Sequence, residues 1–151
     1  MSITSKYIPI DLAEWCTGVD VFAIKSDLEA ERKRKHKDID GPIQTALDYV
    51  MHRLLTTWFI KTHPGKQFNP ELLEKIQWTH AIALRTQHNL WLEAAQGDPD
   101  HEGYTWFPYF KDEANAAIDE IIANGVLYNV DEDSTFEAHE VTKSQPRRLD
   151  R

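Results

Sequence analysis

The chain of 151 residues has a single cysteine, Cys16. No disulfide can form within the chain, so we expect a reducing, cytoplasm-like compartment, or a virion if the protein is viral. The first ten residues lack the basic start, apolar core and small-residue cleavage site of a secretory signal peptide, which favours the same compartment. Cys16 itself is expected to be a small buried thiol.

Long apolar runs are also missing. A membrane-spanning helix needs about 20 mostly apolar residues, and the nearest candidate is only the run Trp58-Phe59-Ile60, which two threonines precede. The sequence therefore predicts no association with a membrane.

Glycine is scarce, and its six residues are scattered along the chain. This spacing fits neither a phosphate-binding loop nor a dinucleotide fingerprint, and the sequence also lacks Gly-x-Ser-x-Gly and Glu-x-x-His. His80 and His88 are eight residues apart, which is not the spacing of helical metal ligands, and His80 is expected to be a core histidine. We therefore predict no catalytic residue, no cofactor and no metal ligand.

Basic residues are almost absent from one stretch of the chain. From Glu93 to Glu140 there are thirteen carboxylates and one basic residue, Lys111, whereas the first 75 residues balance eleven acids with eleven bases. The net charge of −8 therefore comes from this stretch. A field of one sign selects cations, basic proteins or sites that normally hold nucleic acid.

The chain does contain enough apolar residues for a folded core. The hydrophobic fraction is 41% and the charged fraction 28%, both close to globular averages. We predict a mainly α protein: a single helical domain over residues 1–141, built as a bundle of four to five helices. A small C-terminal β-hairpin is expected at 126–141, and a polar tail at 142–151.

The first half of the chain contains two capping-box patterns, at residues 11–14 and 26–29. The first predicts a short helix and the second a charged helix that runs to about Lys37. Residues 19–24 alternate as a strand would, so their state is left open. Pro42 begins a strongly amphipathic helix that ends near His63.

The next expected helix begins at Asn69-Pro70, runs to Gln96 and would be roughly 40 Å long. It is apolar on two sides, which indicates a central helix packed on both; the alternative is that the second side contacts another subunit. The first side holds Leu73, Ile76, Ala83, Leu90, Trp91 and Ala94, and the second holds Trp78, Ile82 and Leu92.

A loop at 97–108 precedes a helix expected from Tyr109 to Asn124. One face of this helix is apolar and the opposite face is acidic. The apolar residues are Ala114, Ala117, Ile118, Ile121 and Ile122, and the acidic residues are Asp112, Glu113, Asp119 and Glu120. An acidic turn at 131–135 then separates the two strands of the expected hairpin.

The loop begins like an EF-hand calcium loop, with Asp98, Asp100 and Glu102 at alternate positions. The resemblance then fails, because Tyr109 stands where the closing glutamate should be. An acidic helix connection is favoured over a weak cation site.

Aromatic residues crowd the end of this loop. They either plug the end of the bundle, which is the favoured interpretation, or form an exposed recognition patch with an acidic rim. The residues are Tyr104, Trp106, Phe107, Tyr109 and Phe110.

The basic cluster from Arg32 to Lys37 has two interpretations. It could grip phosphate or act as an import signal, or it could be the cationic end of a helix whose first turn is acidic, which is favoured. Direct binding of nucleic acid elsewhere is not expected, because the helix from Tyr109 has one lysine against four acids.

These features favour a non-catalytic protein-interaction or assembly protein, such as a structural subunit or adaptor of a larger complex, viral complexes included. Its partner should have a basic surface, and a homo-oligomer is a further expectation. The alternatives are an acidic inhibitor that mimics nucleic acid and a small metal-dependent enzyme. The residues predicted to contact the partner are Asp98, Asp100, Glu102, Tyr104, Trp106, Asp112, Glu113, Asp119, Glu120, Asp131, Glu132 and Asp133.

Overall fold

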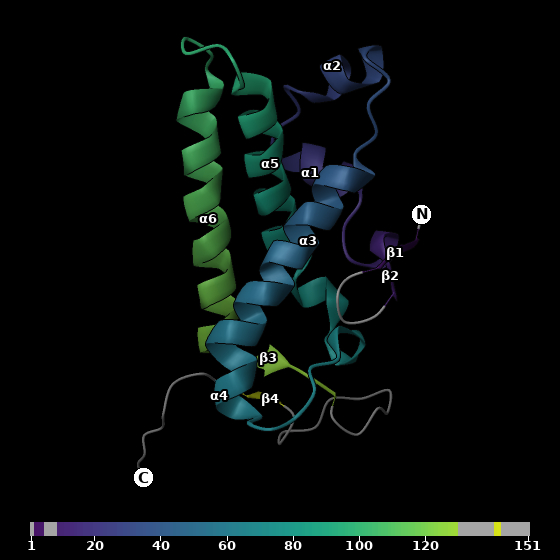
Figure 1. The fold of residues 1–151 in the computed structure, drawn as a ribbon, viewed down its shortest axis with the longest axis vertical. Helices are drawn as coiled ribbons and strands as arrows, with labels where there is room; N and C mark the ends of the chain where they lie inside the picture. The colour runs from purple at the N-terminus through teal and green to yellow at the C-terminus, as the bar shows by residue number, and fades with distance from the viewer. Residues whose placement is uncertain (1, 5–8, 130–140, 143–151) are drawn as a thin grey trace.

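A computed structural model describes residues 2–4, 9–129 and 141–142, and the chain is mainly α-helical, as predicted. Three long helices dominate: α3 (Asp40–Leu54), α5 (Thr79–Ala95) and α6 (Gly103–Asn124). In Figure 1, α5 and α6 run side by side and α3 crosses them obliquely. The shorter helices are α1 (Gly18–Ile24), α2 (Glu29–Arg34) and α4 (Ile60–Thr62).

Helix α5 lies at the centre of the bundle. It packs against α6, α3 and α1, and residues from both of its predicted apolar sides are fully buried, among them Trp78, Ile82 and Trp91. The prediction of a central helix packed on two sides is therefore confirmed. Leu92, which was assigned to the second side, is exposed instead.

The start of this helix was predicted wrongly, because α5 begins ten residues later than Asn69. Residues Pro70–Leu72 and Lys75–Gln77 form two separate 3₁₀ turns. Between them the chain is extended, and the backbone N–H of Glu74 donates to the carbonyl of Leu127 at 3.1 Å. This pairing with the segment after α6 outweighs the local helical pattern, and Ile76 is left exposed.

Helix α3 confirms the amphipathic pattern after Pro42, because its apolar residues form much of the core. The helical path continues through Leu55–Phe59, which is π-helical, into α4. The hydroxyl of Thr57 donates to the carbonyl of Arg53, four residues earlier, at 2.6 Å. Such side-chain bonds compete with the backbone ladder and accompany the local change of helix type.

Residues 19–24, whose state was open, belong to helix α1 and not to a strand. Thr17 caps this helix: its hydroxyl accepts from the N–H of Asp20, whose carboxylate in turn accepts from the N–H of Thr17. The capping box at 11–14 yields a short 3₁₀ helix (Leu12–Glu14). Helix α2 ends at Arg34, which is earlier than predicted.

Helix α6 begins at Gly103, six residues before the predicted start at Tyr109, and includes Pro108. Proline costs one hydrogen bond in a helix. Packing against α5 outweighs this cost, because Gly103 lies against the backbone of Trp91, and the Trp91 and Trp106 rings are 6.2 Å apart. Gly125 ends the helix with φ of 122°, which confirms the predicted glycine stop.

Two short strand pairs are present among the described residues. Strand β1 (Ser2–Thr4) pairs with β2 (Pro9–Asp11), and β3 (Val126–Leu127) pairs with β4 (Val141–Thr142), both in antiparallel register. The hairpin predicted at 126–141 is not confirmed beyond this two-residue pairing, because residues 130–140 lie outside the described residues, as does the tail from 143 onwards. Among the helices that the structure describes, none has both the length and the apolar character to cross a bilayer.

The close contact at Gly103 gives a stability prediction. A Cβ added there would lie 2.7 Å from the Trp91 carbonyl oxygen and 2.8 Å from the Ala95 Cβ, so Gly103→Ala must push α6 away from α5. We expect a loss of about 1–3 kcal/mol in the free energy of unfolding, measured by urea titration with tryptophan fluorescence. Gly41→Ala is the matched control, because nothing lies within 4 Å of its added Cβ. Equal stability of the two variants would contradict this packing argument.

His88 gives a pH prediction. Its ring is buried, its Nδ1–H donates to the Phe107 carbonyl at 2.8 Å, and burial lowers its pKa. The unfolded chain therefore takes up a proton below about pH 6.5 that the folded chain resists, so stability should fall as the pH drops below that value. His88→Gln should reduce the stability lost between pH 7.5 and 5.5, and His80→Gln, at an exposed position of the same helix, is the control. An unchanged loss in His88→Gln would show that other groups cause the acid sensitivity.

Candidate functional site

An acidic groove lies between α5 and α6, with a volume of about 650 Å³. We call it the α5/α6 groove. Leu84 of α5, only 6% exposed, supplies apolar floor, and the small side chains of Ala116 and Ala117 leave room above it. The residues that line the groove are His80, Leu84, Glu113, Ala116, Ala117, Asp119 and Glu120.

The acidic rim of the groove comes from the predicted polar face of α6. Glu113 and Glu120 are seven residues apart, which is nearly two helical turns, so they share a face at a separation of about 10 Å. Both are exposed, and neither has an ion-pair partner within the part of the chain that the structure describes. The groove therefore combines an apolar floor with two uncompensated carboxylates.

Asp119, the third carboxylate at the groove, has a partner. The Arg53 Nη2 of α3 donates to its Oδ1 at 3.2 Å. One turn away, the Tyr49 hydroxyl donates to the Asn115 Oδ1 at 2.8 Å. These two contacts join α3 to α6, so the predicted partner residue Asp119 also has a structural role.

His80 was expected in the core and is exposed at the groove instead. The expectation relied on the helix beginning at Asn69, which would have placed Leu73 and Ile76 on the same face as His80. Because α5 begins only at Thr79, that face does not exist.

The loop carboxylates Asp98, Asp100 and Glu102 do not join the groove. They precede α6, and the 18 residues between Glu102 and Glu120 correspond to about 27 Å of helix. Asp98 Oδ1 accepts from the backbone N–H of Asp100 at 3.1 Å, as in an acidic turn. No group of His, Cys, Asp or Glu side chains that could hold a metal ion occurs within residues 2–4, 9–129 and 141–142.

The aromatic residues beside this loop divide between core and surface. Phe110 is buried, and Trp106 is partly buried beside Trp91, with the Lys25 ammonium 4.0 Å from its ring centre. Tyr104 and Tyr109 are exposed. The favoured bundle-end role thus fits Phe110, Trp106 and Phe107, which is also partly buried against the core, whereas the two tyrosines are exposed near the loop end of α6.

The predicted partner surface is therefore split between two ends of α6. Asp112 and Glu113 lie along the outer face with Glu120, whereas Asp98 and Tyr104 lie at the loop end. Asp131, Glu132 and Asp133 lie outside the described residues.

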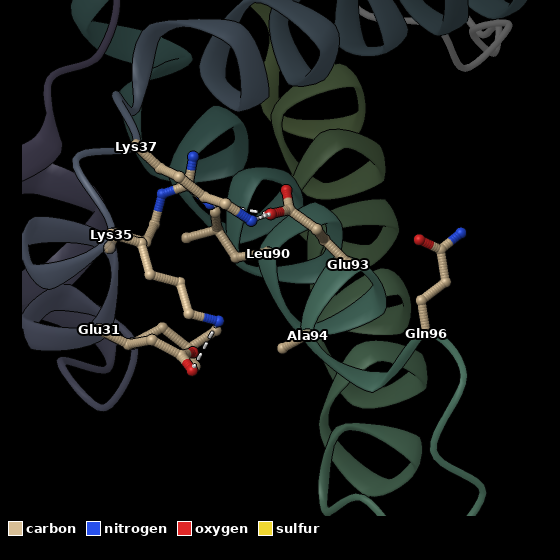
Figure 2. A pocket seen from close by; sticks show the side chains of 9 residues that line it. Glu31, Lys35, Lys37, Leu90, Glu93, Ala94 and Gln96 are labelled. Carbon is tan, nitrogen blue, oxygen red and sulfur yellow. Dashed lines mark hydrogen bonds and ion pairs between the residues drawn. The ribbon is translucent and has the colours of Figure 1, made fainter.

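The basic cluster contacts the start of the acidic stretch. Figure 2 shows a pocket of about 240 Å³ between α2 and α5, in which Lys37 donates to Glu93 at 2.9 Å. Arg32, whose side chain is only 12% exposed, donates to the same carboxylate at 3.4 Å. Lys35 pairs with Glu31 within the α2 segment at 3.4 Å. These contacts support the structural interpretation of the cluster and leave fewer free cations for an external phosphate.

Sequence reasoning missed the groove and the role of Glu93. The groove depends on Leu84 facing Ala116 and Ala117, and the register of two helices cannot be read from either alone. The available signal was the Ala116-Ala117 pair between acidic pairs at a seven-residue spacing.

Cys16 is buried, as expected, at 2% exposure. Burial and the nearby Asp20 raise the pKa of its thiol to about 12. Such a thiol stays protonated at neutral pH and is a poor nucleophile.

The chain matches no known protein family, no curated protein and no solved structure in the comparisons made. The functional argument therefore depends on the geometry of the chain itself.

The ion pairs of Glu93 give a local stability prediction. The hydrogen bond from Lys37 is the main cause that lowers the pKa of Glu93. The ionised Glu93 therefore stabilises the folded chain at pH values above about 4.3, the pKa of an unfolded glutamate. This stabilisation is lost as the pH falls through the lower pKa of the folded state. Glu93→Gln should accelerate amide hydrogen exchange in α2. The global free energy should change by about 1 kcal/mol or less, because Glu93 is 43% exposed and solvent screens its charge.

Glu29→Gln is the control, since Glu29 pairs only with Lys33 in the same helix among the described residues. If it accelerates exchange in α2 as much as Glu93→Gln does, the contact with α5 is not what holds α2 in place.

Proposed function

We propose that this chain is a non-catalytic interaction or assembly protein that binds a basic segment of a partner protein in the α5/α6 groove. The observation that carries the proposal is the combination of an apolar floor at Leu84 with the uncompensated carboxylates Glu113 and Glu120. A segment with an apolar residue between Lys or Arg residues has complementary chemistry.

The charge distribution supports the same proposal. The net charge of −8 attracts basic partners over several ångström and raises their association rate at low salt. Charge alone gives little specificity. The shape of the groove provides the rest, because the small side chains of Ala116 and Ala117 allow close approach of a second chain.

No observation on the described residues favours the other two functions. Mimicry of nucleic acid requires a continuous row of carboxylates, whereas α6 presents two acidic pairs about 10 Å apart, and Asp119 is bonded to Arg53. Asp131, Glu132 and Asp133 lie outside the described residues. A metal-dependent enzyme remains an untested prediction, as do the compartment and membership of a viral complex.

The test is a quantitative pull-down from the native source with the immobilised chain. The double variant Glu113→Lys/Glu120→Lys should retain the specific partner at least about tenfold less well than the unmodified chain, because both rim charges are reversed. The double variant Asp98→Lys/Glu102→Lys is the matched control, since it changes the net charge equally at the other end of α6. Equal losses in both variants would mean that net charge, and not the groove, selects the partner.

A further inference from the structure

We propose that the C-terminal segment of the same chain, residues 143–151, binds in the α5/α6 groove of its own molecule. The inference builds on the proposed function, because the same groove would receive both the segment and an external partner. Three features carry it: the chemistry of the groove, the chemistry of the segment, and the place where the segment leaves the described structure.

The groove suits an occupant with positive charge and some apolar surface. Leu84, Ala116 and Ala117 form an apolar strip, and Glu113 and Glu120 stand on its rim with no ion-pair partner among the described residues. Uncompensated carboxylates beside apolar surface gain most from arginine, which offers charge, several donors and a partly apolar stem.

The C-terminal segment has this composition. It contains Lys143, Arg147, Arg148 and Arg151 against one acid, Asp150. Leu149 lies directly after two arginines, and Asp150 separates it from Arg151. The basic cluster on α2 does not serve the same role, because Arg32 and Lys37 already pair with Glu93.

The segment also begins in the right place. Thr142 of β4 pairs with Val126 of β3, and Val126 follows directly after the end of α6. Ala117 is nine residues before Val126, or about 14 Å back along the helix. The seven residues from Thr142 to Leu149 span up to about 23 Å when extended. The segment is therefore long enough to bring Leu149 back to the groove.

Attachment to the same chain favours this contact over a weak external ligand. A short tether gives an effective concentration in the millimolar range without any new contact. An external basic partner must then displace the segment, so removal of its charges should increase the affinity of that partner. The groove would be selective because only partners that bind better than the chain's own segment could enter.

The experiment uses the full-length chain with a spin label at residue 150, introduced by Asp150→Cys. Cys16 is buried and its thiol stays protonated, so the label attaches to the new cysteine alone. We expect the amide NMR signals of Leu84, Ala116 and Ala117 to lose intensity, whereas those of α1 keep it. The loss should disappear at about 0.5 M salt, where the screening length is only a few ångström. It should also disappear in Glu113→Lys/Glu120→Lys but persist in Asp98→Lys/Glu102→Lys.

Three results would overturn the inference. The first is intensity loss that is absent or spread evenly over the chain. The second is loss that persists in Glu113→Lys/Glu120→Lys while that variant keeps a folded amide spectrum. The third is equal loss when a spin-labelled chain without isotope label is mixed with an isotope-labelled chain that carries no spin label, which would assign the groove to a second copy.

The outcome is separable from that of the proposed function. If the pull-down finds a partner whose binding depends on the groove but the spin-label effect is absent, only the role proposed for residues 143–151 is rejected. If the spin-label effect is present but the pull-down finds no such partner, the proposal of an external partner is rejected and the proposal for residues 143–151 stands.

Discussion

The burial of α5 on several sides is the constraint on which the rest of the structure depends. Its one buried amide, Gln87, must have its hydrogen bonds met within the protein. The Nε2 of Gln87 donates to the carbonyls of Val21 and Lys25 at 2.9 and 2.8 Å, and its Oε1 accepts from the Trp91 indole at 3.1 Å. These carbonyls lie in and just after α1, so a single side chain of α5 fixes the path of the N-terminal part. The position of α1 in turn determines where the next segment, which contains α2, begins.

Several charged side chains form ion pairs within the fold and are therefore not available to a partner. Arg32 and Lys37 hold Glu93, and Arg53 holds Asp119. Opposite charges that are far apart in the sequence thus connect the α2 segment to α5, and α3 to α6. The surface proposed to bind a partner is what these pairs leave uncompensated. It is smaller than the acidic stretch of the sequence and lies mainly on one face of α6.

Periodicity was sufficient for helices with a strong apolar pattern, whereas the capping signal at 26–29 was not, because α2 begins at Glu29 without a side-chain cap. The apolar stripe after Pro42 and the two-sided pattern near Trp91 predicted α3 and the central place of α5, because burial alone determines such patterns. The start of α5 could not be predicted, since Glu74 bonds to Leu127, more than fifty residues later. The early start of α6 depends similarly on the fit of Gly103 against α5. Of the candidate site, the acidic face of α6 was predictable from spacing, but the groove itself was not.

The missing side chain at Gly103 has a consequence for the groove at the far part of the helix. It lets the backbones of α5 and α6 approach each other closely at that end. Ala116 lies 13 residues further along α6, about 20 Å away, so one helix carries both the close contact and the groove. The contact at Gly103 thus helps to set the distance between the two helices that form the groove. A segment that binds there loses its own conformational freedom, but the protein itself loses little. A small contact area can then still give specific binding.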